Sequence, residues 1–346
     1  MRKTFLAIFG LAPCILLQPS GTRSAAQEDP THLRMNVVLV QLSIAVTDSK
    51  GNYVNGLHPE DFEVTEDKIP QKISSFEEGS GSGNDADPNG SDRPDIMLPP
   101  AGSKESQPVD SHLQTASTTL LEPHGNQASV FVLFDTSNYM YRSFVFAQDA
   151  ITDFIRSMDN ASKIAFYSYC RDLSRAMQLT SDHFRIVSAV RSTVAGDDAA
   201  LYNSLLLTVK DAAPLKGRKA IVVFSNGPDN ASSVPPEDVA ELAQSTGTII
   251  YIISTRQAED DPASAAAFER MSKVSGGKAY FAKNWLDEKK AFSSIREDLV
   301  HLYTLSYYPQ SNPNKGWRAI KVRLVGKNLQ KYHLRTRDGY RLVAQR

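Results

Sequence analysis

A run of polar side chains follows the most apolar strand-like segment of the chain. Asp135 and Ser137 come directly after residues 130–134, which are all apolar. A continuous apolar run of this length is typical of a strand buried on both faces of a sheet. Asn226 follows a second such run at residues 220–224. Because ligands bind beyond the carboxyl ends of strands in open α/β sheets, the sequence predicts a binding edge built from these side chains.

Other sequence patterns that could form a catalytic or metal site are weaker. Residues 85–90 place oxygen ligands and a glycine as in the start of a calcium loop, but the twelfth position is Ile96 instead of a glutamate. The histidines are scattered, and no nucleophile elbow, Walker loop or dinucleotide fingerprint occurs. Cys170 has no sequence feature that would activate its thiol. The sequence therefore gives no reason to expect an enzyme.

Strand and helix patterns alternate between residues 128 and 301. Apolar runs at 130–134, 220–224 and 248–253 predict buried strands. The segments that follow these strands carry apolar residues at helical spacing, as in the last one, which has Phe292, Ile295, Leu299 and Leu302. Repeated strand–helix units with short connections predict a doubly wound, mostly parallel α/β sheet with helices on both faces.

The two flanking segments have the period of strands and opposite charge. Residues 48–78 carry eight acidic and three basic residues, whereas 315–346 carry ten basic residues and one acidic residue. Each segment alone offers about three short strands, too few to bury much apolar surface. We therefore predict that both segments form one small β-sandwich, with the acidic and basic strips facing each other across strands.

Three motifs resemble those of a von Willebrand factor A-type (vWA) domain, which has a Rossmann-like fold. Residues 135–139 resemble its first loop, Asp-x-Ser-x-Ser, and residues 199–205 its Thr-Ala-Leu-Tyr-Asp-Ala-Leu helix start. Residues 221–227 resemble its strand that ends in Thr-Asp-Gly. The flanks, as at 46–51 and 305–309, are similar to the bacterial VWFA-related acidobacterial domain proteins.

The resemblance implies a metal-ion-dependent adhesion site, but this sequence departs from the ligand set. Asp135 and Ser137 match the first aspartate and serine. Tyr139 stands in place of the second serine, Ala199 in place of the threonine, and Asn226 in place of the second aspartate. Mg²⁺ needs near-octahedral oxygen ligands, and three of the five family positions no longer provide the expected group.

Two interpretations of this site remain open. We favour a degenerate site without a cofactor, in which Asp135 and Ser137 hydrogen-bond neighbouring loops. The alternative is a Mg²⁺ site with a substitute ligand beside Ala199, made of Asp135, Ser137 and Asp198. In either case the predicted binding face contains Tyr139, Ala199 and Asn226.

The N-terminal residues have the order of a secretory signal. Arg2 and Lys3 precede an apolar run at 5–17, and Ala25-Ala26 follows. We predict that residues 1–26 are removed, which leaves 35 basic and 39 acidic residues. This balance gives no reason to expect a nucleic-acid partner, and no later segment has eighteen consecutive apolar residues, so no membrane span is expected.

These observations predict a domain order and a function. The predicted parts are a signal peptide (1–26), an N-terminal β segment (27–78), a flexible linker (79–127), a vWA domain (128–301) and a C-terminal β segment (302–346) that packs with 27–78. The predicted function is a secreted or periplasmic, non-catalytic protein that binds a protein, matrix or envelope ligand. A Mg²⁺-dependent adhesin is one alternative and a hydrolase is another. The sequence does not specify the oligomeric state.

Overall fold

The computed structural model describes residues 39–79, 128–158, 162–255 and 260–342. The predicted signal peptide, the calcium-loop-like residues 85–90 and all of the predicted linker except Gly79 lie outside these ranges. Among the described residues, no helix is both long enough and apolar enough to cross a membrane.

A six-stranded sheet forms the centre of the region between residues 129 and 301. Its strand order is β10-β9-β8-β5-β6-β7, and every neighbouring pair is parallel except β6–β7. The bounds are β5 (Ser129–Asp135), β6 (Lys163–Tyr169), β7 (Leu173–Thr180), β8 (Lys219–Phe224), β9 (Ile249–Ser254) and β10 (Ala279–Phe281). Strands β8 and β9 are buried along their whole length, which explains their continuous apolar sequences.

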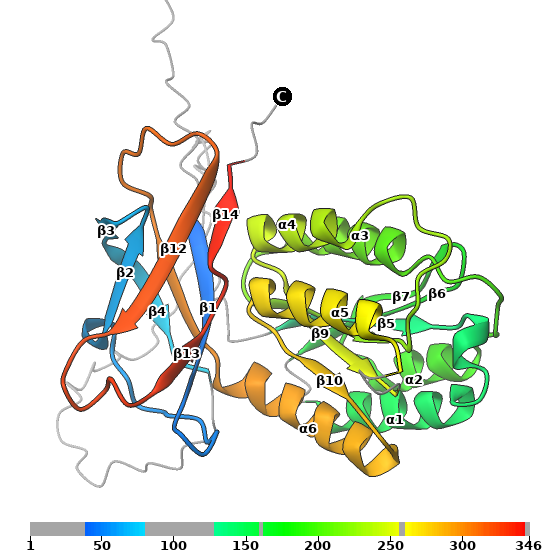
Figure 1. The fold of residues 1–346 in the computed structure, drawn as a ribbon. Helices are drawn as coiled ribbons and strands as arrows, with labels where there is room; N and C mark the ends of the chain where they lie inside the picture. Colours follow the sequence, from blue (N-terminus) through cyan, green and yellow to red (C-terminus); the bar gives the residue numbers. More distant parts are fainter. Residues whose placement is uncertain (1–38, 80–127, 159–161, 256–259, 343–346) are drawn as a thin grey trace, which may run out of the picture. The chain divides into compact units, whose positions relative to one another are not determined.

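Helices cover both faces of this sheet. They are α1 (Phe144–Ser157), α2 (His183–Arg191), α3 (Leu201–Ala212), α4 (Pro236–Thr246), α5 (Pro262–Ser275) and α6 (Trp285–His301). One apolar cluster joins side chains of α1, α2 and α6 to the sheet, and a second joins those of α3, α4 and α5 (Figure 1). This arrangement confirms the predicted doubly wound α/β architecture. The sequence analysis missed α2, which has only nine residues.

The N- and C-terminal segments form two further four-stranded sheets. Their orders are β13-β1-β11-β4 and β14-β12-β2-β3. Strands from the two ends of the chain alternate in the first sheet, and in the second sheet the C-terminal β12 pairs with the N-terminal β2. The bounds are β1 (Val40–Thr47), β2 (Phe62–Glu66), β3 (Ile69–Gln71), β4 (Ile73–Glu77), β11 (Tyr303–Tyr307), β12 (Trp317–Leu324), β13 (His333–Arg335) and β14 (Gly339–Arg341), with a 3₁₀ turn at Pro59–Asp61. One apolar cluster fills the space between them. The predicted small β-sandwich is therefore confirmed.

Part of the charge pairing also follows the sequence prediction. Strands β2 and β12 are antiparallel neighbours, and Glu63 accepts a hydrogen bond from Arg323 at 2.6 Å. Glu66 is fully buried and pairs with Arg318 at 2.8 Å. Other C-terminal arginines pair with the α/β domain, because Arg335 contacts Asp298 of α6. The basic C-terminal segment thus divides its charges between two partners.

Candidate functional site

Asp135 lies at the carboxyl end of β5 and is fully buried. Its Oδ1 accepts the backbone N–H of Ser137 at 2.9 Å, and its Oδ2 accepts the hydroxyl of Ser225 at 2.7 Å. The Tyr169 hydroxyl donates in turn to Ser225 Oγ at 2.9 Å. Burial raises the pKa of Asp135, and these hydrogen bonds oppose that effect. Both carboxylate oxygens therefore already have protein donors.

The residues after Asp135 form a short 3₁₀ turn at Asn138–Met140. Ser137 precedes this turn, and its hydroxyl oxygen is buried without a hydrogen-bond partner among the described residues. Tyr139 is half-buried in the turn, and the following Tyr141 is 51% exposed. The Tyr141 hydroxyl donates to Asp197 at 3.2 Å, which ties this loop to the one before α3.

Asn226 connects the loops that follow three different strands. Its Oδ1 accepts both the backbone N–H of Thr255, at 2.9 Å, and the hydroxyl of the same residue. Its Nδ2 donates to the backbone oxygen of Tyr139 at 3.4 Å. An aspartate could not make the contact with the Tyr139 oxygen, because a carboxylate has no N–H to donate. The amide at this position therefore holds the loop edge together.

The loop before α3 brings its backbone to this edge. Ala199 is fully buried, and its N–H donates to Asn230 Oδ1 at 2.7 Å. Asp198 has a side chain that is 44% exposed and lies 3.6 Å from Arg171. Asp229 accepts the Tyr202 N–H at 2.9 Å and so caps the start of α3. Of the predicted binding face, Ala199 is fully buried and its backbone oxygen accepts the N–H groups of Asn230 and Ala231, whereas Tyr139 and Asn226 are partly exposed.

Comparison with known proteins identifies the α/β region. Residues 129–294 match the family model of the von Willebrand factor type A domain. This region is a vWA domain. The comparison with curated proteins gives no match.

Solved structures similar to this chain include three bacterial proteins. The conserved hypothetical protein BatB from Bacteroides thetaiotaomicron is 16% identical, with a TM-score of 0.41, over 50% of this chain and 97% of that one. An aerotolerance-related membrane protein from Bacteroides fragilis is 17% identical, with a TM-score of 0.42, over 50% and 98%. The vWF domain of the type V pili tip protein Mfa5 from Porphyromonas gingivalis is 12% identical, with a TM-score of 0.41, over 49% and 94%.

The loop edge of this vWA domain offers few of the side-chain oxygens that a Mg²⁺ site needs. The ion takes about six oxygen ligands in near-octahedral geometry. Asp135 and Ser137 offer side-chain oxygens, but both oxygens of Asp135 are engaged. Ala199 has no side-chain oxygen, and that of Asn226 is occupied by Thr255. In the part of the chain that the structure describes, no three His, Cys, Asp or Glu side chains form a metal-binding group.

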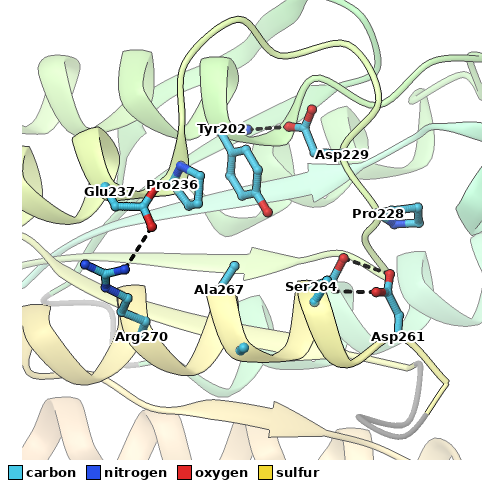
Figure 2. Close-up of a pocket in the computed structure, with 11 residues that line it drawn as sticks. Tyr202, Pro228, Asp229, Pro236, Glu237, Asp261, Ser264, Ala267 and Arg270 are labelled. Carbon is cyan, nitrogen blue, oxygen red and sulfur yellow. Dashed lines mark hydrogen bonds and ion pairs between the residues drawn. The ribbon is translucent and has the colours of Figure 1, made fainter.

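A cavity of about 450 Å³ lies beside the loop edge (Figure 2). Its wall combines Tyr202 of α3 with prolines and alanines, and Glu237 pairs with Arg270 at 2.8 Å at its edge. Burial, together with the nearby carboxylates, raises the pKa of Tyr202 to about 12. Among the described residues, the lining contains no histidine, cysteine or lysine.

Three residues at this site were not identified from the sequence. Ser225 and Tyr169 hold the Asp135 carboxylate, and Thr255 holds Asn226. Ser225 adjoins Asn226 within the third vWA motif, so its position alone could have drawn attention to it. Tyr169 ends β6 and Thr255 directly follows β9, and no local pattern marks either residue.

Proposed function

We propose that this protein is a secreted, non-catalytic binding protein that uses the loop face of its vWA domain for adhesion to a protein or envelope ligand. The observation that supports this proposal is the state of Asp135, whose two oxygens accept hydrogen bonds from Ser137 and Ser225. In this arrangement the carboxylate organises loops and needs no cation for its stability. The ligand would then meet protein side chains directly.

Exposed side chains on the loop face support this role. Tyr141 is 51% exposed, and Asp197, its hydrogen-bond partner, is exposed as well. Tyrosine is enriched at protein interfaces because its ring contributes apolar area and its hydroxyl can form a hydrogen bond. Tyr139 and Asn226, both partly exposed, adjoin this pair through the contact between Asn226 Nδ2 and the Tyr139 oxygen.

Calorimetric titration of the wild-type protein with Mg²⁺ and with Mn²⁺ tests the metal-independent mechanism. We expect only the heat of dilution for both ions. Asp135→Ala is the matched variant, because it removes the one carboxylate at the end of β5. Heat of binding that appears in the wild type and vanishes in this variant would contradict the proposal.

A direct binding assay tests adhesion. Immobilised collagen, fibronectin and laminin serve as probes, each with EDTA and with Mg²⁺. We expect binding to at least one probe to survive EDTA and to weaken in Tyr141→Ala, but not in Phe184→Ala, an exposed aromatic on α2. If binding is lost in EDTA, or Tyr141→Ala binds every probe as the wild type does, the proposed mechanism fails.

The second candidate is a Mg²⁺-dependent adhesin. The buried, unpartnered hydroxyl of Ser137 beside Asp135 favours it, because a cation would give that oxygen a partner. The same titration distinguishes the two candidates. In this case the heat of binding would disappear in both Asp135→Ala and Ser137→Ala.

A further inference from the structure

Four apolar side chains are exposed at the starts of two neighbouring helices. Val145 and Phe146 of α1 are 62% and 65% exposed, and Trp285 and Leu286 of α6 are 66% and 47% exposed. We call these four residues the α1–α6 patch. Exposed groups of large apolar side chains on a soluble protein mark sites of association.

Contacts between the helices show that the two halves of the patch adjoin. The rings of Phe154 and Phe292 lie 4.9 Å apart, and Asp153 lies 4.0 Å from Lys289 Nζ. Both helices begin after the carboxyl end of a parallel strand, so they run in the same direction (Figure 1). Trp285 is one turn before Lys289, and Phe146 is two turns before Asp153 on the same stripe of α1. The two aromatic side chains therefore occupy adjoining stripes at the same end of the helix pair.

Charged residues of opposite sign follow the patch along each helix. On α1 the side chains of Asp149 and Asp153 are 56% and 57% exposed. On α6 the side chains of Lys289 and Lys290 are 61% and 68% exposed. One helix thus presents a row of two acids and the other a row of two bases, next to a shared apolar end. Within one chain Asp149 pairs with Arg191, and Asp153 lies 4.0 Å from Lys289, so these side chains would have to share their partners in a dimer.

We propose that the α1–α6 patch binds the same patch of a second copy of this chain, around a two-fold axis parallel to the helices. Such an axis places α1 of one copy on α6 of the other. The acidic row then faces the basic row twice, and the apolar ends meet. A two-fold contact is self-complementary, and this charge pattern meets that requirement.

The size of the patch indicates a weak dimer. The four side chains of the patch are about half to two-thirds exposed. With the surrounding charged residues, the patches of two copies together would bury on the order of 1,000 Å². This area is near the lower end of specific interfaces, so we expect dimers at high micromolar concentration and monomers in dilute solution.

Sedimentation velocity of the whole protein, over about a hundredfold range of concentration, tests the dimer. We expect a concentration-dependent shift from monomer to dimer. The double variant Phe146→Ser/Trp285→Ala should raise the dissociation constant by about tenfold or more, as aromatic residues at an interface centre usually do. Phe184→Ser is the control, because Phe184 is 85% exposed on α2 and outside the patch. A protein that stays monomeric throughout, or a control that weakens the dimer equally, would overturn the proposal.

Charge reversal tests the two-fold geometry. Asp153→Lys places a lysine opposite Lys289 of the other copy, and Lys289→Glu places a glutamate opposite Asp153, so each variant should self-associate more weakly than the wild type. A mixture of the two variants pairs opposite charges at both contacts and should restore association. If the mixture associates no more strongly than either variant alone, α1 of one copy does not pack on α6 of the other.

Discussion

Asp298 of α6 is expected to be the strongest single link between the vWA domain and the β-sandwich segments. It is fully buried, and it accepts hydrogen bonds from the Tyr53 hydroxyl and from Arg335 of β13. Lys278 Nζ lies 3.9 Å away. Tyr53 and Arg335 come from the two terminal segments, so one carboxylate joins three distant parts of the chain.

We predict that Asp298→Ala lowers the free energy of unfolding by about 3–5 kcal/mol. The substitution leaves the Arg335 guanidinium, whose side chain is only 22% exposed, without its charged partner. The Tyr53 hydroxyl also loses its acceptor. A typical domain has a total stability of about 5–15 kcal/mol, so this loss would be large. Asp298→Asn keeps an acceptor for Tyr53 and should cost about 1–3 kcal/mol.

The two tryptophans allow each part of the molecule to be followed separately in urea. Trp285 lies in α6 and Trp317 in β12, so two single-tryptophan variants report on the vWA domain and on the sandwich. We expect the two transitions to coincide in an otherwise wild-type chain and to separate when Asp298 is replaced by alanine. Asp149→Ala is the control, because its pair with Arg191 is largely exposed and should contribute less than about 1 kcal/mol.

Two results would refute this reasoning. One is a loss of stability in Asp298→Ala no larger than that in the Asp149→Ala control. The other is an Asp298→Leu/Arg335→Met double variant no more stable than Asp298→Ala, since removal of both charges should relieve the unpaired guanidinium.

Three further predictions concern other buried groups. Burial lowers the pKa of Lys219 from 10.5 to about 8, so the folded state binds fewer protons than the unfolded state between these values and stability rises with pH there. Lys219→Met should remove up to about 3 kcal/mol of this rise, as measured by urea unfolding at several pH values. Glu66→Ala should lower the free energy of unfolding by about 3–5 kcal/mol, because it leaves the buried Arg318 unpaired. The Arg323 side chain is 65% exposed, so Arg323→Ala should lower it by less than about 1 kcal/mol in the same assay. Ala199→Thr/Asn226→Asp should bind Mg²⁺ in a calorimetric titration, and the absence of heat would show that restoring these two ligand types is insufficient.

The main strands could be predicted because each is buried on both faces. Strands β8 and β9 need apolar residues at every position, and the chain shows them as uninterrupted runs. The edge strand β7 is partly exposed, and its pairing with β6 contains two register shifts, so its sequence gives a weaker signal. The nine-residue helix α2 was missed for a related reason, since a short half-exposed helix has few periodic positions.

The candidate site was only partly predictable. Asp135 and Asn226 were found because they follow buried strands and occupy motif positions. Their actual partners are Tyr169, which ends β6, Ser225, which follows β8, and Thr255, which follows β9. Parallel pairing brings these strand ends to one edge, and that pairing is a long-range contact which no local pattern contains.

By itself, the sequence determined the layers of this protein and the positions at its loop edge that depart from the family's metal ligands. Apolar periodicity fixes which faces must be buried, and a replaced side chain cannot supply a ligand that it does not contain. The charge asymmetry of the two ends also predicted that they would meet. Only the tertiary structure decided which atoms satisfy Asp135 and that Arg335 and Arg341 of the C-terminal segment pair with the vWA domain. Hydrogen bonds and buried ion pairs need distances of about 3 Å, correct to within a few tenths of an ångström, between residues far apart in the chain. Those distances exist only after packing is complete.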